Sequence, residues 1–245
     1  MKRNEIYIGD CLELMPKHIE DKSVDMIFCD LPYGTTKCKW DSVIDLSKLW
    51  SEYERIIKDN GVILLFAQTP FDKVLGASNL KMLKYEWIWQ KTHPTGHLNA
   101  KKMPMKAHEN ILVFYKKPPT YNPQKTTGHK RKVSSIKHKE ACESIDSDVY
   151  NKGQKPTHYD STERYPLSVQ IFASDKQKSK LHSTQKPIYL IEYMIKTYTN
   201  EGDLILDNAA GSGTTGLGAK KLKRDYIMME QDPDIYEIAC KRLLT

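Results

Sequence analysis

The sequence predicts an α/β protein with a largely parallel sheet, and three features support this prediction. Short apolar runs rich in Val, Ile and Phe alternate along the chain with segments of helical periodicity. Residues 24–66 follow the order strand, helix, strand at the length of a βαβ unit, which joins parallel strands. Acidic residues directly follow several of the apolar runs. Because the carboxyl ends of parallel strands meet at one edge, this pattern predicts a ligand site there.

The expected elements follow from periodicity and from turn residues at their ends. The apolar runs expected to form strands are residues 5–8, 24–29, 62–66, 85–90, 110–115, 204–207 and 226–229. Helical spacing is found in residues 12–19, 45–58, 70–78, 188–199, 217–222 and 236–243. Asp10 is expected to cap the first helix and to line the ligand edge. Asn60 and Gly61 are expected to end the second helix as a C-cap pair.

Composition limits the class of protein. A chain of 245 residues is long enough for one large α/β domain with an insertion or for two small domains. We expect no membrane association, because no apolar run reaches the length of a membrane span. We also expect no signal peptide. The five cysteines are odd in number and lack a C-x-x-C spacing, which indicates a reducing cytoplasm and argues against structural zinc.

Residues 30–34, Asp-Leu-Pro-Tyr-Gly, follow a buried apolar run and form the first candidate site. Pro32 fixes its own φ and restricts Leu31 to extended conformations, so the carbonyls of this turn keep a fixed geometry. Together with the carboxylate of Asp30 and the ring of Tyr33, they suit a flat ring that carries an amino group. Alone, such a string more often marks an ordinary turn at a strand end, so other motifs must support this interpretation.

The net charge of +7 arises in one part of the chain. Residues 116–180 contain fourteen Lys and Arg against seven Asp and Glu, whereas the rest of the chain has 24 of each. The segment also carries Tyr121, Tyr150, Tyr159 and Tyr165. A basic segment with interspersed aromatic residues suits a phosphate backbone, although a solvated loop has a similar composition.

Two further loops are expected near the ligand edge. Residues 93–102 form a basic stretch that is too long for a hairpin turn. Residues 182–187 precede a helix that Pro187 can start, and Lys186 beside that helix start would attract a carboxylate. His108 and Glu109 are neighbours in a strand and therefore face opposite sides, so they do not indicate a metal site.

Residues 204–216 form the second candidate site, in which a strand ends at Asp207 and a glycine turn opens a helix. The turn satisfies G-x-G-x-x-G, and Glu230 follows its first glycine by nineteen residues, as in the dinucleotide fingerprint. An NAD(P)-dependent oxidoreductase is therefore one alternative. Asp207 argues against it, because a carboxylate there would repel a pyrophosphate. The twenty-nine residues after Gly216 are also too few for a second nucleotide-binding half.

A ligand with adenosine, a cationic group and no phosphate fits this stretch better, and S-adenosylmethionine has these properties. Glu230 can accept both ribose hydroxyls, and the glycines allow close approach of the methionine part. Asp207 or Asp30 can then meet the ammonium group.

Three segments resemble the signature motifs of the amino-directed DNA methyltransferases, namely residues 30–33, 207–213 and 182–187. Their order, with the catalytic motif first and the cofactor glycines last, resembles the β-class arrangement. The resemblance implies a Rossmann-like methyltransferase sheet, mostly parallel and circularly permuted, built from residues 1–115 and 181–245. It implies that residues 116–180 are an inserted, basic DNA target-recognition region. The last helix would then lead toward the first strand, so the chain ends would be neighbours.

The resemblance also assigns roles to single residues. Those implied to hold the target base are Asp30, Pro32 and Tyr33. Those implied to bind S-adenosylmethionine are Asp10, Cys11, Asp30, Lys186, Asp207, Gly211, Gly213, Thr214 and Glu230. Two positions depart from the family pattern. Leu31 replaces a usual Pro and keeps the backbone carbonyl, whereas Ala209 replaces a usual aromatic residue and removes packing against the cofactor.

The implied reaction is site-specific methyl transfer from S-adenosylmethionine to the exocyclic amino group of adenine in double-stranded DNA. The base must leave the stack to enter the crevice, where Tyr33 can stack on it. Asp30 and a carbonyl of Leu31 or Pro32 would accept the amine N–H bonds and free the nitrogen lone pair for direct in-line transfer.

Adenine is preferred to cytosine-N4 because the catalytic motif begins with Asp. A catalytically silent nucleic-acid-binding module and RNA or protein amines are further alternatives. The small recognition region suits a short site or a homodimer.

Overall fold

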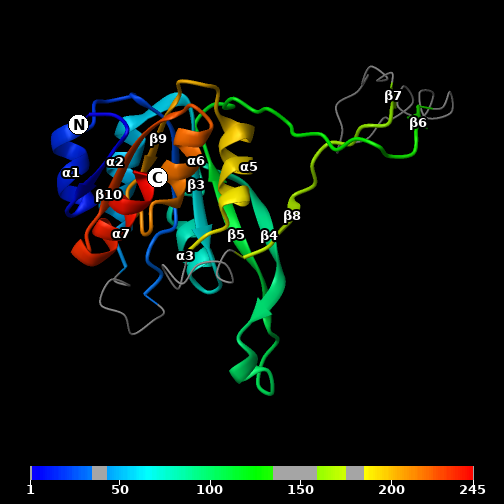
Figure 1. Ribbon diagram of the computed structural model, residues 1–245, viewed down its shortest axis with the longest axis horizontal. Helices are drawn as coiled ribbons and strands as arrows, with labels where there is room; N and C mark the ends of the chain where they lie inside the picture. Colours follow the sequence, from blue (N-terminus) through cyan, green and yellow to red (C-terminus); the bar gives the residue numbers. More distant parts are fainter. Residues whose placement is uncertain (1, 35–42, 135–158, 175–184, 245) are drawn as a thin grey trace. The chain divides into compact units, whose positions relative to one another are not determined.

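The computed structural model describes residues 2–34, 43–134, 159–174 and 185–244 of the chain (Figure 1). They form two compact units, of which the larger comprises Met1–Asn122 and Ser168–Thr245 and the smaller Pro123–Leu167. Tyr150 and positions 182–184 of the predicted motif lie outside the described residues. Within the described residues, no helix is long and apolar enough to cross a membrane.

The larger unit contains an eight-stranded sheet in the order β1-β10-β9-β2-β3-β5-β4-β8. Its strands are β1 (Glu5–Ile8), β2 (Val24–Cys29), β3 (Ile57–Ala67), β4 (Leu83–Thr95), β5 (Lys106–Phe114), β8 (Val169–Phe172), β9 (Leu204–Asp207) and β10 (Asp225–Glu230). Its helices are α1 (Cys11–His18), α2 (Leu46–Ile56), α3 (Phe71–Ser78), α5 (Ile188–Tyr198), α6 (Thr214–Lys221) and α7 (Pro233–Leu243), with a 3-10 turn, η1, at His97–Asn99.

The sheet is mostly parallel, as expected. Strand β5 runs antiparallel to its neighbours β3 and β4, whereas the other neighbouring pairs are parallel. The first strand pairs with the last, from Glu5 opposite Ile227 to Ile8 opposite Glu230. The amino-terminal strand and the carboxy-terminal part of the chain are therefore neighbours in one sheet.

Helices cover both faces of the sheet (Figure 1). Ile27 and Cys29 of β2 pack in the core formed with α1, α2 and α3, whereas Met26 and Phe28 pack in the core formed with α5, α6 and α7. Successive side chains of a strand point to opposite faces, so a strand that is covered on both sides is apolar throughout. This is why the central strands were recognisable as continuous apolar runs.

The predicted end of the second helix is wrong. Helix α2 ends at Ile56, and β3 begins at Ile57 and runs through Asn60 and Gly61. A Cβ atom on Gly61 would lie 2.9 Å from the backbone oxygen of Asp25 and 2.8 Å from the Ile57 side chain. The glycine therefore permits close approach to β2, at an irregularity in the β2–β3 pairing.

The strands β4 and β5 are longer than the sequence suggested and project as a hairpin from the sheet (Figure 1). The expected loop 93–102 is shortened at its start, because β4 continues to Thr95. Pro94 lies where the ladder register shifts, a position at which a residue without an N–H donor is tolerated. Thr95 pairs with Lys106 at the last rung before the tip.

The smaller unit lies inside the segment 116–180 that is expected to be an insertion. It contains a two-stranded antiparallel sheet of β6 (Lys132–Val133) and β7 (Asp160–Ser161). Arg131 donates two hydrogen bonds, of 2.7 and 2.6 Å, to the carboxylate of Asp160.

Candidate active site

A cavity of about 710 Å³ lies where four parallel strands end. Asp10 follows β1, Asp30 follows β2, Asp207 ends β9 and Glu230 ends β10, and all four line the cavity. The parallel pairing of these strands brings their carboxyl ends to the same edge of the sheet. The volume lies within the usual range for ligand sites, roughly 300 to 1,000 Å³.

The cavity is lined by ten of the eleven residues expected to form the site, which are Asp10, Cys11, Asp30, Pro32, Tyr33, Lys186, Asp207, Gly211, Thr214 and Glu230. Gly213 is not among the lining residues. It has a φ of 77° at the start of α6, and a Cβ atom there would lie 3.2 Å from Ala239 of α7. Its place in the fold is a tight turn and close packing of two helices.

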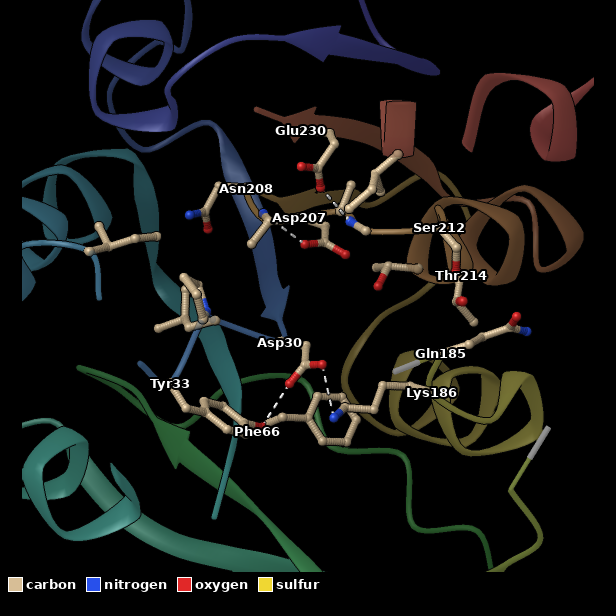
Figure 2. A pocket seen from close by; sticks show the side chains of 18 of the residues that line it. Asp30, Tyr33, Phe66, Gln185, Lys186, Asp207, Asn208, Ser212, Thr214 and Glu230 are labelled. Atoms are coloured by element: carbon tan, nitrogen blue, oxygen red, sulfur yellow. Dashed lines mark hydrogen bonds and ion pairs between the residues drawn. The ribbon is translucent and has the colours of Figure 1, made fainter. Parts of the chain in front are cut away.

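Asp30 is held from two sides (Figure 2). The hydroxyl of Tyr33 donates to its Oδ1 at 2.7 Å, and the ammonium of Lys186 lies 2.9 Å from its Oδ2. The Asp30 side chain stays 27% exposed, so a ligand can still reach it. Burial raises the pKa of Asp30 above its ordinary value; Lys186 lowers it, and Glu109 raises it again.

Aromatic rings border the same part of the cavity. The Tyr33 ring stacks on Phe71, with centroids 5.1 Å apart and an interplanar angle of 29°. The ammonium of Lys186 lies 4.8 Å from the centroid of the Phe66 ring. A flat ligand ring that enters here meets an aromatic face, a carboxylate and a cation.

Two residues of this site were not expected from the sequence. Glu109 of β5 accepts from Lys186 at 2.8 Å, and Lys91 of β4 lies 2.6 Å from the other oxygen of Glu109. The sequence signal was weak, because β4 also carries Glu86 and Gln90, and β5 also carries His108 and Asn110. Lys186 also differs from expectation, because two carboxylates of the protein itself surround it.

The glycine turn is tied to Glu230. One oxygen of this carboxylate accepts the N–H of Gly211 at 2.8 Å, and the other accepts the N–H groups of Gln231 and Asp232, both at 2.9 Å. Burial raises the pKa of Glu230, and these three backbone donors oppose that rise. These three bonds occupy three of the roughly four lone-pair positions, so hydroxyl groups of a ligand would have to share the fourth or displace a backbone donor.

Asp207 lies between Glu230 and Asp30 (Figure 2). Burial raises its pKa to about 6, although Thr215 and the backbone N–H of Ala209 donate to it. A carboxyl group with this pKa is ionised at neutral pH. A cationic group of a bound ligand would stabilise this ionised form.

The wall of the cavity fits a polar ligand. Asn208 Nδ2 and Gln185 Oε1 are buried and have no hydrogen-bond partner, a state that the structure shows for no other side-chain atom among the described residues. Both residues line the cavity. Gly211 has open space where a Cβ atom would stand. Orphaned donors and acceptors, carboxylates and an accessible backbone fit a ligand with hydroxyl, amino and carboxylate groups, such as S-adenosylmethionine.

Comparisons with known proteins agree with this site. The family model described as DNA methylase, N6/N4 type, matches residues 24–241. The Type II methyltransferase M2.MboI of Moraxella bovis is 27% identical over 267 residues, which cover 98% of this chain and 88% of that protein. The Type II methyltransferase M1.MboII of the same organism is 30% identical over 245 residues, covering 91% of this chain and 90% of that protein.

Solved structures show the same fold. The complex of M1.HpyAVI with S-adenosylmethionine has a TM-score of 0.64 and 23% identity, covering 97% of this chain and 98% of that one. The cytosine-N4-specific PvuII DNA methyltransferase has a TM-score of 0.69 and 17% identity, covering 100% and 88%. These similarities confirm the expected methyltransferase sheet.

The family match covers most of the chain and includes the ends of the strands β2, β9 and β10 that form the cavity. It confirms S-adenosylmethionine as the expected cofactor and decides against the oxidoreductase alternative. The chain belongs to the N6/N4 amino-methyltransferase family of DNA methylases.

Proposed function

We propose that this protein is a Type II DNA methyltransferase that methylates the exocyclic amino group of adenine in double-stranded DNA. The observation that carries the proposal is the position of Asp30 in the cavity, between the Tyr33 hydroxyl and the Lys186 ammonium. Leu31 and Pro32 line the cavity beside it. These groups supply the acceptors and the aromatic face that a flipped base requires.

The residues act on a weak nucleophile. The lone pair of an exocyclic amine is delocalised into its ring, so its N–H groups need acceptors that draw the nitrogen out of the plane. Asp30 Oδ1 is one acceptor, once Tyr33 releases it, and a carbonyl of Leu31 or Pro32 is the other. When bound, S-adenosylmethionine supplies an electrophilic methyl group. After transfer the nitrogen must lose one proton, and Asp30 is the base placed to take it.

We assign the opposite part of the cavity to the cofactor. The carboxylate of Glu230 accepts the ribose hydroxyls, and Asp207 meets the ammonium group. Asp10 and Cys11 border the adenine, and the turn at Gly211 admits the methionine part. The burial of these carboxylates in one cavity with unpartnered polar atoms supports the assignment.

DNA is proposed to contact two basic segments. The insertion 116–180 is the target-recognition region, although its strand β8 also joins the sheet of the catalytic domain, which residues 1–115 with 181–245 form. The β4–β5 hairpin is the second contact, because residues 92–108 carry three Lys, three His and no acidic residue. Thr95 and Lys106 line the cavity, so the hairpin tip begins at the site that the base must enter.

Adenine is preferred because the catalytic motif begins with Asp, and cytosine-N4 is the second candidate. The structural likeness to a cytosine-N4-specific enzyme keeps that candidate open. A cytoplasmic location is proposed as well, supported by the free thiols of Cys11 and Cys29.

Transfer of a labelled methyl group from S-adenosylmethionine to duplex DNA, followed by nucleoside analysis, tests the function. We expect labelled N6-methyladenine with the wild type and none with Asp30→Ala. Labelled N4-methylcytosine would show that the target base is cytosine and not adenine. Absence of any transfer while the cofactor still binds would contradict the proposal.

A further inference from the structure

Four charged residues, largely removed from solvent, alternate in sign along one wall of the cavity. Lys91 Nζ lies 2.6 Å from Glu109 Oε1. Lys186 Nζ lies 2.8 Å from Glu109 Oε2 and 2.9 Å from Asp30 Oδ2. Glu109 thus has one ammonium group at each oxygen, and Lys186 has one carboxylate on each side. This series is called the charge chain below.

The charge chain joins four separate elements. Lys91 belongs to β4 and Glu109 to the neighbouring β5, while Asp30 follows β2 and Lys186 precedes α5. The side chains of Lys91 and Glu109 are each 6% exposed. Burial raises the pKa of Glu109, but Lys186 and Lys91 outweigh it and hold this pKa below its ordinary value. Glu109 is therefore ionised at neutral pH.

Stability alone does not account for the charge chain. Removing two charges from water costs about as much as their attraction returns, and apolar replacements of buried ion pairs are often neutral. All four members of the charge chain line the cavity. The charge chain ends at Asp30, the carboxylate to which we assign proton acceptance. A function at that carboxylate is the simpler explanation.

Glu109 affects Asp30 in two ways. It anchors the ammonium of Lys186 from the far side, so Lys186 stays on Oδ2 and does not occupy Oδ1. It also shares the positive charge of Lys186, which leaves more negative charge on Asp30 than a simple ion pair would. The net result is an acceptor oxygen that is both oriented and basic.

We propose that Glu109 is a positioning residue for methyl transfer, which holds Lys186 on Oδ2 of Asp30 and keeps it off Oδ1, where the amino group of the target base takes the place of the Tyr33 hydroxyl. Lys91 holds Glu109 in turn. This inference rests on the proposed function of Asp30 and deepens it. Glu109 and Lys91 act through Lys186 and need not touch the reacting atoms.

The central test is Glu109→Gln, which keeps the shape of the side chain and removes its charge. Glu192→Gln is the matched control. Glu192 is also a buried carboxylate, 8% exposed, with a lysine 2.7 Å away at Lys221, but it does not line the cavity. Glu109→Asp serves as the conservative variant.

We expect Glu109→Gln to lower the single-turnover methylation rate by about tenfold or more, with the cofactor Kd within about twofold of wild type. Glu109→Asp should recover part of the rate, and Glu192→Gln should keep it. Equal rates in wild type and Glu109→Gln, or equal losses in Glu109→Gln and Glu192→Gln, would overturn the inference. Wild-type methylation would leave the proposed function intact in either case.

The pH profile separates positioning from a structural role. Asp30 is faced by Lys186, Tyr33, Glu109 and, across the cavity, Asp207. In Glu109→Gln, Lys186 pairs with Asp30 alone and lowers the pKa of Asp30 further. The acid limb of the methylation rate against pH should therefore move to lower pH. In Lys91→Gln, Glu109 draws Lys186 away from Asp30, so the limb should move to higher pH. Shifts in the same direction, or none in a folded variant, would contradict the charge chain.

A measurement without catalysis completes the test. Burial lowers the pKa of Lys186, but Asp30 and Glu109 outweigh it and raise this pKa above its ordinary value. NMR titration of ¹⁵N-labelled lysine side chains should therefore show a lower Lys186 pKa in Glu109→Gln than in wild type. An unchanged pKa would overturn the inference, and a wild type that fails to methylate DNA would separately overturn the proposed function. If Glu109→Gln does not fold, Lys91→Gln supplies the same two readouts.

Discussion

Glu230 at the end of β10 accepts the backbone N–H of Gly211 at 2.8 Å, and so a strand end holds the glycine turn that precedes α6. The two residues are nineteen positions apart in sequence and adjacent in space. The carboxylate assigned to the ribose hydroxyls therefore also fixes the turn assigned to the methionine part. One side chain couples both halves of the proposed cofactor site.

This coupling predicts a large effect of Glu230→Gln. A glutamine offers one acceptor oxygen in place of two, so it cannot serve both Gly211 and the pair Gln231 and Asp232. We expect cofactor affinity to fall by about tenfold to a hundredfold, roughly 1.4 to 3 kcal/mol, in a calorimetric titration. Glu237→Gln, on the exposed face of α7, is the control and should bind as the wild type does.

Asp207 predicts a pH dependence of cofactor binding. Its pKa of about 6 means that it carries a negative charge at pH 7.5 and loses that charge as the pH falls below 6. If it meets the ammonium group, affinity should decrease from pH 7.5 to pH 5. Asp207→Asn should bind more weakly at pH 7.5 and show a flatter profile. A variant profile as steep as that of the wild type would assign the titration to another group.

The same raised pKa predicts that the stability of the protein falls as the pH rises, whereas cofactor affinity increases. Between the unfolded value near 4 and about 6, the native state holds more protons than the unfolded state, so the free energy of unfolding falls as the pH rises. Asp207→Asn removes this contribution. Relative to wild type, the variant should gain up to about 3 kcal/mol between pH 4 and pH 7, as measured by urea denaturation. A constant difference across that range would contradict the shift.

The hairpin predicts a salt-dependent loss of DNA binding. If Lys101 and Lys102 each neutralise one phosphate, changing both to Gln should weaken binding and reduce the slope of log K against log salt by roughly 1.8. The control is Lys17→Gln on α1, whose partner is Glu13. Binding that matches the wild type at every salt concentration would exclude the hairpin from the interface.

Gly61 predicts a packing defect in β3. In Gly61→Ala the new methyl group would lie within 2.9 Å of the Asp25 backbone and the Ile57 side chain, so strands β2 and β3 would have to separate. We expect a loss of about 1 to 3 kcal/mol in the free energy of unfolding. Gly76→Ala in α3 is the matched control, because its nearest contact is 3.5 Å and alanine favours a helix by about 1 kcal/mol. Equal stability of the two variants would contradict this account of Gly61.

Sequence patterns predicted seven of the eight strands of the sheet, all but β8, and the acidic residues at the strand ends that line the site. The strands covered on both faces had to be apolar throughout, which made β2 and β9 recognisable, and acidic residues at their ends marked the crevice. These signals are local, because an apolar run and the residue that follows it are adjacent in the chain. Three short motifs resemble those of the amino-directed DNA methyltransferases, and this resemblance assigned them one common function.

Only the tertiary structure decided the boundary between α2 and β3 and the partners of Lys186. The pairing of Val24 with Ile57 draws residues 57–61 into a strand, although their sequence is typical of a helix end. Glu109 and Lys186 are 77 positions apart, and no pattern along the chain links them. Charged side chains on separate elements form ion pairs only after those elements pack. A charged side chain needs such a partner because it is buried.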